Sequence, residues 1–81
     1  MTIKNVVDFY FNNYDALEIN IEKWNGLEGK SYFLTKKSFY ETLSGWLNEE
    51  VISVSFETHF TNYSTKEIKE CKHPHLYILH W

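Results

Sequence analysis

The fold of this chain is decided by residues 38–60, which read SFYETLSGWLNEEVISVSFETHF. Ser38 is followed three residues later by Glu41. This is the spacing of a capping box, so a helix is predicted to begin here. At about 100° per residue the apolar side chains that follow form one stripe, which predicts a face packed on a core. The stripe consists of Phe39, Leu43, Trp46 and Leu47, with Tyr40 at its edge.

From Val51 the apolar period changes to two. Every second side chain is polar, and the positions between are β-branched or aromatic, which predicts a half-buried strand directly after the helix. The apolar positions are Ile52, Val54, Phe56 and Phe60, and the polar ones are Ser53, Ser55, Glu57 and His59.

A first helix is predicted near the N-terminus. It starts at Ile3, has Thr2 as its N-cap, and ends at Asn12 and Asn13 after about three turns. Its apolar stripe consists of Ile3, Val6, Val7, Tyr10, Phe11 and Tyr14.

A β-hairpin is predicted around Asn25-Gly26, because a type I′ turn needs positive φ at both of its central residues. A two-residue loop pairs Trp24 with Leu27, Ile19 with Tyr32, and Leu17 with Leu34. The inner face then carries Leu17, Ile19 and Ile21, whereas the outer face carries Glu18, Asn20, Glu22 and Trp24, with Phe33 beside Glu18.

The C-terminal segment HLYILHW, residues 75–81, is apolar on both strand faces. Leu76 and Ile78 lie on one face, and Tyr77, Leu79 and Trp81 on the other. This pattern predicts a strand inside the sheet or at a partner contact. Residues 61–73 are polar, and a short helical turn and an edge strand are both open interpretations there.

These elements predict an α+β fold for residues 1–81 as a single domain. The expected architecture has two layers, with an antiparallel sheet of about four strands and two helices on one face, in the order α-β-β-α-β-β.

Composition and the absence of known motifs exclude several classes of function. The net charge is −3, and the eight cations are all Lys, so the arginine fork that reads phosphates and base edges is missing, and direct nucleic-acid binding is not expected. No phosphate-binding loop or nucleophile motif occurs, so neither an enzyme nor a cofactor is expected. No apolar run approaches the ~20 residues of a membrane span and the start lacks a secretion signal, so a cytoplasmic location is expected.

Cys71, His73 and His75 form a weak candidate for a metal site. Pro74 interrupts the spacing, and the strand period sends His75 and His80 to opposite faces. Histidines at a strand end, without a metal, are the preferred interpretation.

Protein binding is the predicted function, because large apolar groups stand beside acids on the wet side of the sheet. The candidate partner-binding residues are Glu18, Glu22, Trp24, Leu27, Phe33 and Glu57. Alternatively, the chain is a structural homodimer joined through its C-terminal strand, with Tyr77, Leu79 and Trp81 as candidates, or a His/Cys metal-binding domain.

In its size, its acidity, its abundance of Asn, Lys, Ile, Tyr and Phe and its lack of catalytic motifs, the chain resembles small accessory proteins of phages and mobile elements, including anti-CRISPR inhibitors. The resemblance implies a stoichiometric inhibitor. Its acidic surface would occupy a basic nucleic-acid or target-recognition site on a host defence nuclease.

Overall fold

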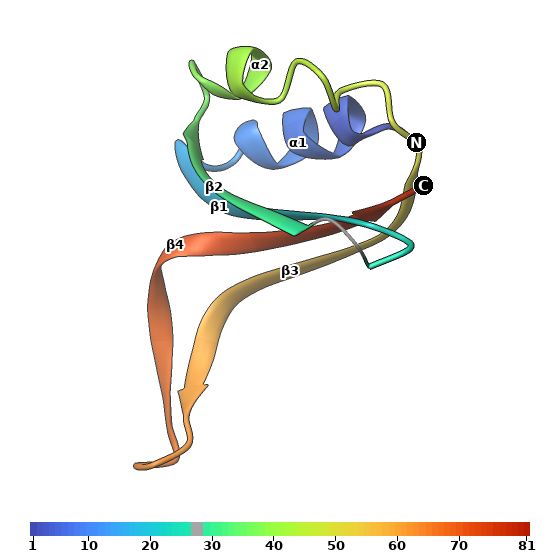
Figure 1. Ribbon diagram of the computed structural model, residues 1–81. Coiled ribbons are helices and arrows are strands. Elements are labelled where there is room, and N and C mark those ends of the chain that lie inside the picture. Colours follow the sequence, from blue (N-terminus) through green and yellow to red (C-terminus); the bar gives the residue numbers. More distant parts are fainter. Residues whose placement is uncertain (27–28) are drawn as a thin grey trace.

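The computed structural model describes residues 1–26 and 29–81 as an α+β fold with two helices and a four-stranded sheet. The elements follow the predicted order along the chain, and both helices lie over one face of the sheet (Figure 1). They are α1 (Ile3–Phe11), β1 (Ala16–Lys23), β2 (Gly29–Thr35), α2 (Phe39–Thr42), β3 (Val51–Asn62) and β4 (Glu67–His80). Neither helix in the described residues is long and apolar enough to cross a membrane.

The sheet is mixed, so the prediction of an antiparallel sheet is correct for the β1–β2 and β3–β4 pairs but wrong for the β1–β4 pair. Its strand order is β2-β1-β4-β3, and β4 runs parallel to β1 but antiparallel to β3. The predicted pairing of Ile19 with Tyr32 and of Leu17 with Leu34 is confirmed. A hairpin motif fixes only the pairing of its own two strands, so the position of β4 beside β1 depends on tertiary packing.

The core lies between the two helices and the facing side of the sheet. Ile3, Val7, Leu17, Ile19 and Leu76 are among its fully buried side chains. The predicted stripe of α1 is confirmed, with Tyr10 and Tyr14 packed at its margin. Thr2 caps this helix as predicted, since its hydroxyl accepts a hydrogen bond from the backbone amide of Asn5 at 3.3 Å.

The predicted helix from Ser38 to about Leu47 is wrong in its length and its cap. α2 contains only four residues, and the Ser38 hydroxyl accepts from the Thr35 amide instead of capping the helix. Residues 43–49 form turns and a bend instead of a helix, and two of their carbonyl groups accept hydrogen bonds from α1. The Ile3 amide donates to the Glu49 carbonyl and the Lys4 amide to the Leu47 carbonyl, both at 3.0 Å. Two amides at the first turn of α1, which no helical carbonyl can reach, thereby gain partners.

The predicted burial of the strand beginning at Val51 is also wrong in part. Phe56 is half-buried and stacks on Tyr10 with ring centroids 4.4 Å apart. Ile52, Val54 and Phe60 are exposed, because β3 lies at the sheet's edge and its second half leaves the sheet.

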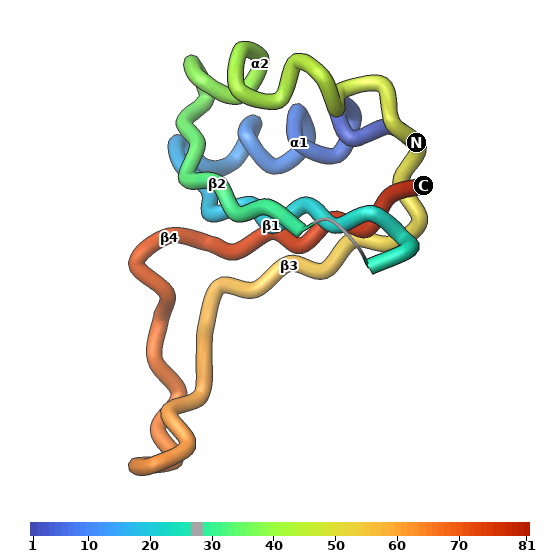
Figure 2. Tube along the Cα trace, viewed as in Figure 1, coloured from blue at the N-terminus to red at the C-terminus, as the bar shows by residue number. Residues whose placement is uncertain are grey.

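The far ends of β3 and β4 form a hairpin that bends away from the helical layer (Figure 2). We call residues 58–73 the arm. At the bend Glu57 pairs with His75 and His59 with Glu70, so one β3 residue, Thr58, opposes four β4 residues, 71–74. Pro74 belongs to this irregular stretch, where its missing amide breaks no regular ladder. Of the two interpretations left open for residues 61–73, the strand is the one observed. These residues form the end of β3, the tip of the hairpin and the start of β4.

Candidate functional site

The face of the sheet opposite the helices carries the acids and rings singled out in the sequence. We call it the open face and define it by three rows that cross the strands in the order β2, β1, β4 and β3. The first row is Phe33, Glu18, His75 and Glu57; the second is Ser31, Asn20, Tyr77 and Ser55; the third is Gly29, Glu22, Leu79 and Ser53.

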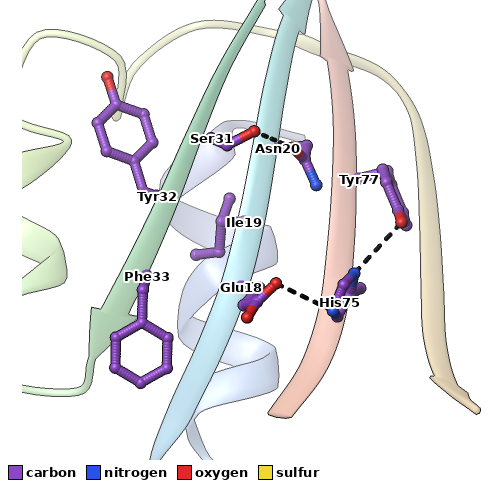
Figure 3. A pocket seen from close by; sticks show the side chains of 8 residues that line it. All are labelled: Glu18, Ile19, Asn20, Ser31, Tyr32, Phe33, His75 and Tyr77. Atoms are coloured by element: carbon purple, nitrogen blue, oxygen red, sulfur yellow. Dashed lines mark hydrogen bonds and ion pairs between the residues drawn. The ribbon is translucent and has the colours of Figure 1, made fainter. Parts of the chain in front are cut away.

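Glu18 and Glu57 lie on either side of His75, on the two strands that flank β4. The His75 Nε2 atom is 3.0 Å from the Glu18 Oε2 atom, and its Nδ1 atom is 3.3 Å from the Tyr77 hydroxyl (Figure 3). The imidazole is therefore held between a carboxylate and a phenol. Glu22 lies two rows further along, roughly 13 Å from Glu18 by the strand rise.

Glu18, His75 and Tyr77 line a shallow hollow of about 460 Å³. Asn20 and Ser31 are hydrogen-bonded to each other at its far side, and Phe33 forms part of its rim (Figure 3). A carboxylate, neutral polar groups and an exposed ring thus converge on one depression. Such a surface can accept hydrogen bonds from a cationic group and pack against an apolar one.

A second hollow, of about 280 Å³, lies where the arm leaves the sheet. Phe60, Cys71 and His73 of β3 and β4 line it together with Glu18 and Glu57. The ring of His73 also lies 4.7 Å, centroid to centroid, from that of Phe33. The inner side of the arm and the open face therefore make one continuous surface.

The charge on this surface acts on Tyr77. Burial raises the pKa of its phenol, and the negative charges of Glu57, Cys71 and Glu18 raise that pKa further. The physical cause is that a phenolate would be poorly solvated and would stand among like charges. The centre of the open face is thus a negative environment.

The structure brings together most of the predicted partner-binding residues. Glu18, Glu22, Phe33 and Glu57 all lie on the open face. Trp24 follows β1 and packs its ring against Trp81, with centroids 5.9 Å apart. Leu27 lies outside the described residues.

The predicted dimer candidates Tyr77, Leu79 and Trp81 belong to this same region. Tyr77 and Leu79 occupy its second and third rows, and Trp81 lies beside Trp24. Between His75 and His80, β4 has β1 on one side and β3 on the other, so the backbone of this stretch, which includes Tyr77 and Leu79, has no free edge for a further strand. Within this stretch, only the side chains of β4 can face a second molecule.

Cys71, His73 and His75, the weak metal candidates, lie near one another at the bend. Within residues 1–26 and 29–81, however, no three His, Cys, Asp or Glu side chains are arranged to hold a metal ion. His75 is instead paired with Glu18, and His73 packs on Phe33.

Sequence reasoning missed His75, His73 and Phe60 as parts of this surface. Strand alternation puts residues 73, 75 and 77 on one side, a signal that was present. That this side faces Glu18 follows only from the parallel pairing of β4 with β1. Comparison of the chain with protein-family models, with curated proteins and with solved structures finds no match.

Proposed function

We propose that this chain is a non-catalytic protein-binding module that holds a basic partner protein against its open face. The observation that carries the proposal is the first row of that face, where two carboxylates flank His75 and an exposed ring, Phe33, completes the row. Both helices lie on the other side of the sheet (Figure 1).

The shape of the molecule supports this function. The arm leaves the sheet on the side away from the helices, so the open face and the arm form two walls of an angle (Figure 1). Phe60, which is 49% exposed, lies where the walls meet. A partner seated in this angle would contact both walls and would bury more surface than on a flat sheet.

Aromatic and charged groups have different roles in this proposal. Each exposed ion pair with a partner Lys or Arg contributes only about 0.2–1 kcal/mol, so the carboxylates chiefly steer and orient the partner. Phe33, Trp24 and Phe60 supply the apolar contacts that dominate affinity in most interfaces.

The proposed class of partner is a nucleic-acid-binding nuclease of a host defence system, blocked at a one-to-one ratio. A basic site that holds phosphates also attracts carboxylates, and Glu18, Glu22 and Glu57 present three carboxylates on one face. The resemblance in size and composition to anti-CRISPR inhibitors points to the same class.

Capture from a bacterial lysate followed by mass spectrometry tests the proposal. The immobilised wild-type chain should retain a basic nuclease, and added chain should inhibit its DNA cleavage at equimolar ratio. The variant Glu18→Lys/Glu57→Lys should weaken capture about tenfold or more, since a tenfold loss is only about 1.4 kcal/mol.

The matched control is Glu41→Lys/Glu49→Lys. It changes net charge by the same amount at two exposed residues on and after α2, away from the open face. If the two variants retain the partner equally well, the open face is not the binding surface. A captured protein without a basic surface would refute the proposed partner class.

A further inference from the structure

The outer edge of β3 is a second surface, separate from the open-face side chains. β3 is the last strand of the sheet, and only its start is covered. Thr2 forms a bridge with Glu50, and the Val51 amide donates to the Met1 carbonyl at 2.9 Å. Beyond Val51, the described residues place no strand along this edge, so its outward amides and carbonyls are available for pairing.

Register shifts at Val51/Ser53 and at Glu57/His59 bound this edge, and between them its sequence carries no charged residue or Pro that would oppose strand pairing. Residues 52–56 read ISVSF, with no charge, Pro or Gly, and the first charged residue is Glu57. The opposite edge, β2, begins with Gly29 and Lys30, and two further lysines follow it at residues 36 and 37. Lysine and glycine weaken edge pairing, whereas a long β-branched edge promotes it.

An apolar groove runs beside the same edge, on the helix side of the sheet. It has a volume of about 400 Å³ and lies between α1 and β3. Phe9 on α1 is 63% exposed and Val54 on β3 is 37% exposed. The groove residues are Met1, Asn5, Val6, Phe9, Tyr10 and Val54. α1 is too narrow to cover the whole apolar side of β3, so these groups remain in contact with water.

We propose that a second copy of this chain covers this surface, with the two β3 strands paired antiparallel about a two-fold axis. An unpaired edge next to an apolar groove needs an occupant that is both extended and apolar, and β3 itself has both properties. With the axis at Ser55, Glu57 would face Ser53 of the second copy, so the pairing of residues 53–57 lies beyond the part of the edge that Met1 covers. No like charges then meet along the pair, and the interface uses the same patch on both molecules.

Symmetry also accounts for the groove. A two-fold axis perpendicular to the sheet keeps both helical layers on the same side, so Phe9 and Val54 of one copy would approach those of the other. The result would be a continuous sheet of eight strands. Its two open faces would lie side by side, and an arm would descend at each end of the central strand pair.

Sedimentation velocity over a dilution series, with protein that carries no tag, tests the dimer. The wild-type chain should sediment at about twice its 9.8 kDa mass and dissociate on dilution. Phe9→Lys and Val54→Lys should each weaken the dimer about 100-fold, because the axis buries the unpaired charge twice. Both sites are exposed in the single chain, so circular dichroism should show an unchanged fold.

Phe33→Lys is the matched control, since it places the same charge on an exposed ring of the open face. It should leave the dimer intact. A wild-type chain that stays monomeric at every concentration would overturn the proposal, and so would a dimer broken by Phe33→Lys rather than by Phe9→Lys. None of these outcomes depends on the proposed basic partner.

Cross-linking locates the axis independently. In a Cys71→Ser background, oxidation of Ser55→Cys should give a covalent dimer, because a residue at the axis meets its own copy about 4.5–5.5 Å away. Ser31→Cys on β2 should give none. A dimer that cross-links through Ser31→Cys alone would place the interface at the wrong edge of the sheet.

Discussion

The Nε2 atom of His75 lies 3.0 Å from the Oε2 atom of Glu18, although one residue is in the first strand of the chain and the other in the last. This contact exists because β4 is inserted beside β1 in parallel register. It joins the acidic surface predicted around the first hairpin to the aromatic one predicted at the C-terminus. A single surface results.

The coupling between these two side chains should be small. Both are partly exposed, so a double-mutant cycle of Glu18→Gln and His75→Gln should give about 0.2–1 kcal/mol in the free energy of unfolding. Urea denaturation at neutral pH measures it. Glu57 also flanks His75 in register, but the two imidazole nitrogens lie against Glu18 and Tyr77, so the cycle with Glu57→Gln should give less. Equal couplings would mean that His75 does not prefer Glu18.

Tyr77 reports on the electrostatics of the open face. Burial and the charges of Glu57, Cys71 and Glu18 raise the pKa of its phenol above that of free tyrosine. Subtracting the 295 nm titration of Tyr77→Phe from that of the wild type should isolate this group. Glu57→Gln should lower the pKa of Tyr77, because it removes a nearby negative charge.

The sign of the effect on stability follows from linkage. A phenol whose pKa is raised on folding contributes stability that is fully present below the unfolded pKa of about 10 and is lost as the pH rises through the folded value. Above pH 10 the wild type should therefore lose more of its free energy of unfolding than Tyr77→Phe. A Tyr77 titration at or below that of free tyrosine would contradict this account.

Local patterns predicted the elements whose burial is set by their own residues. The first helix with its Thr2 cap, the hairpin register and the apolar side of β1 were all obtained from sequence periodicity. In each of these, neighbouring residues supply both the signal and the contacts. Apolar residues on both faces of 75–81 predicted a strand either inside the sheet or at a partner contact, and β4 lies inside the sheet.

The errors occur where a distant part of the chain competes for the same groups. In the turns after α2, the Leu47 and Glu49 carbonyls accept hydrogen bonds from the first amides of α1. The predicted second helix therefore ends early. β3 shows a strand period, but its position at the edge and the bend at Glu57 leave most of its apolar residues exposed. The alternation of apolar and polar residues cannot show whether another element packs on the apolar side of a strand. It also cannot show whether two strands far apart in the sequence pair parallel or antiparallel.

The two helix caps predicted from the sequence, Thr2 for α1 and Ser38 for α2, should differ in their effect on stability. Thr2 and Asn5 bond reciprocally at the start of α1, so Thr2→Ala should cost about 1 kcal/mol. Glu41 belongs to the spacing that forms no side-chain cap, and Glu41→Ala should change the free energy of unfolding by less than about 0.5 kcal/mol. Urea denaturation of both variants measures the difference. A larger loss from Glu41→Ala would mean that α2 is capped in solution after all.

Truncation of two strand isoleucines should lower the free energy of unfolding by very different amounts, because one lies in the core and the other on the arm. Ile19 is fully buried in β1, so Ile19→Ala should cost about 2–5 kcal/mol of the free energy of unfolding. Ile68 pairs with Thr61 near the tip of the arm and is 74% exposed. Ile68→Ala should therefore stay within about 0.5 kcal/mol of the wild type. Thermal and urea denaturation at a protein concentration where the chain is monomeric would measure both variants. If Ile68→Ala destabilises the isolated chain as much as Ile19→Ala does, the arm must pack onto the domain in solution rather than project from it.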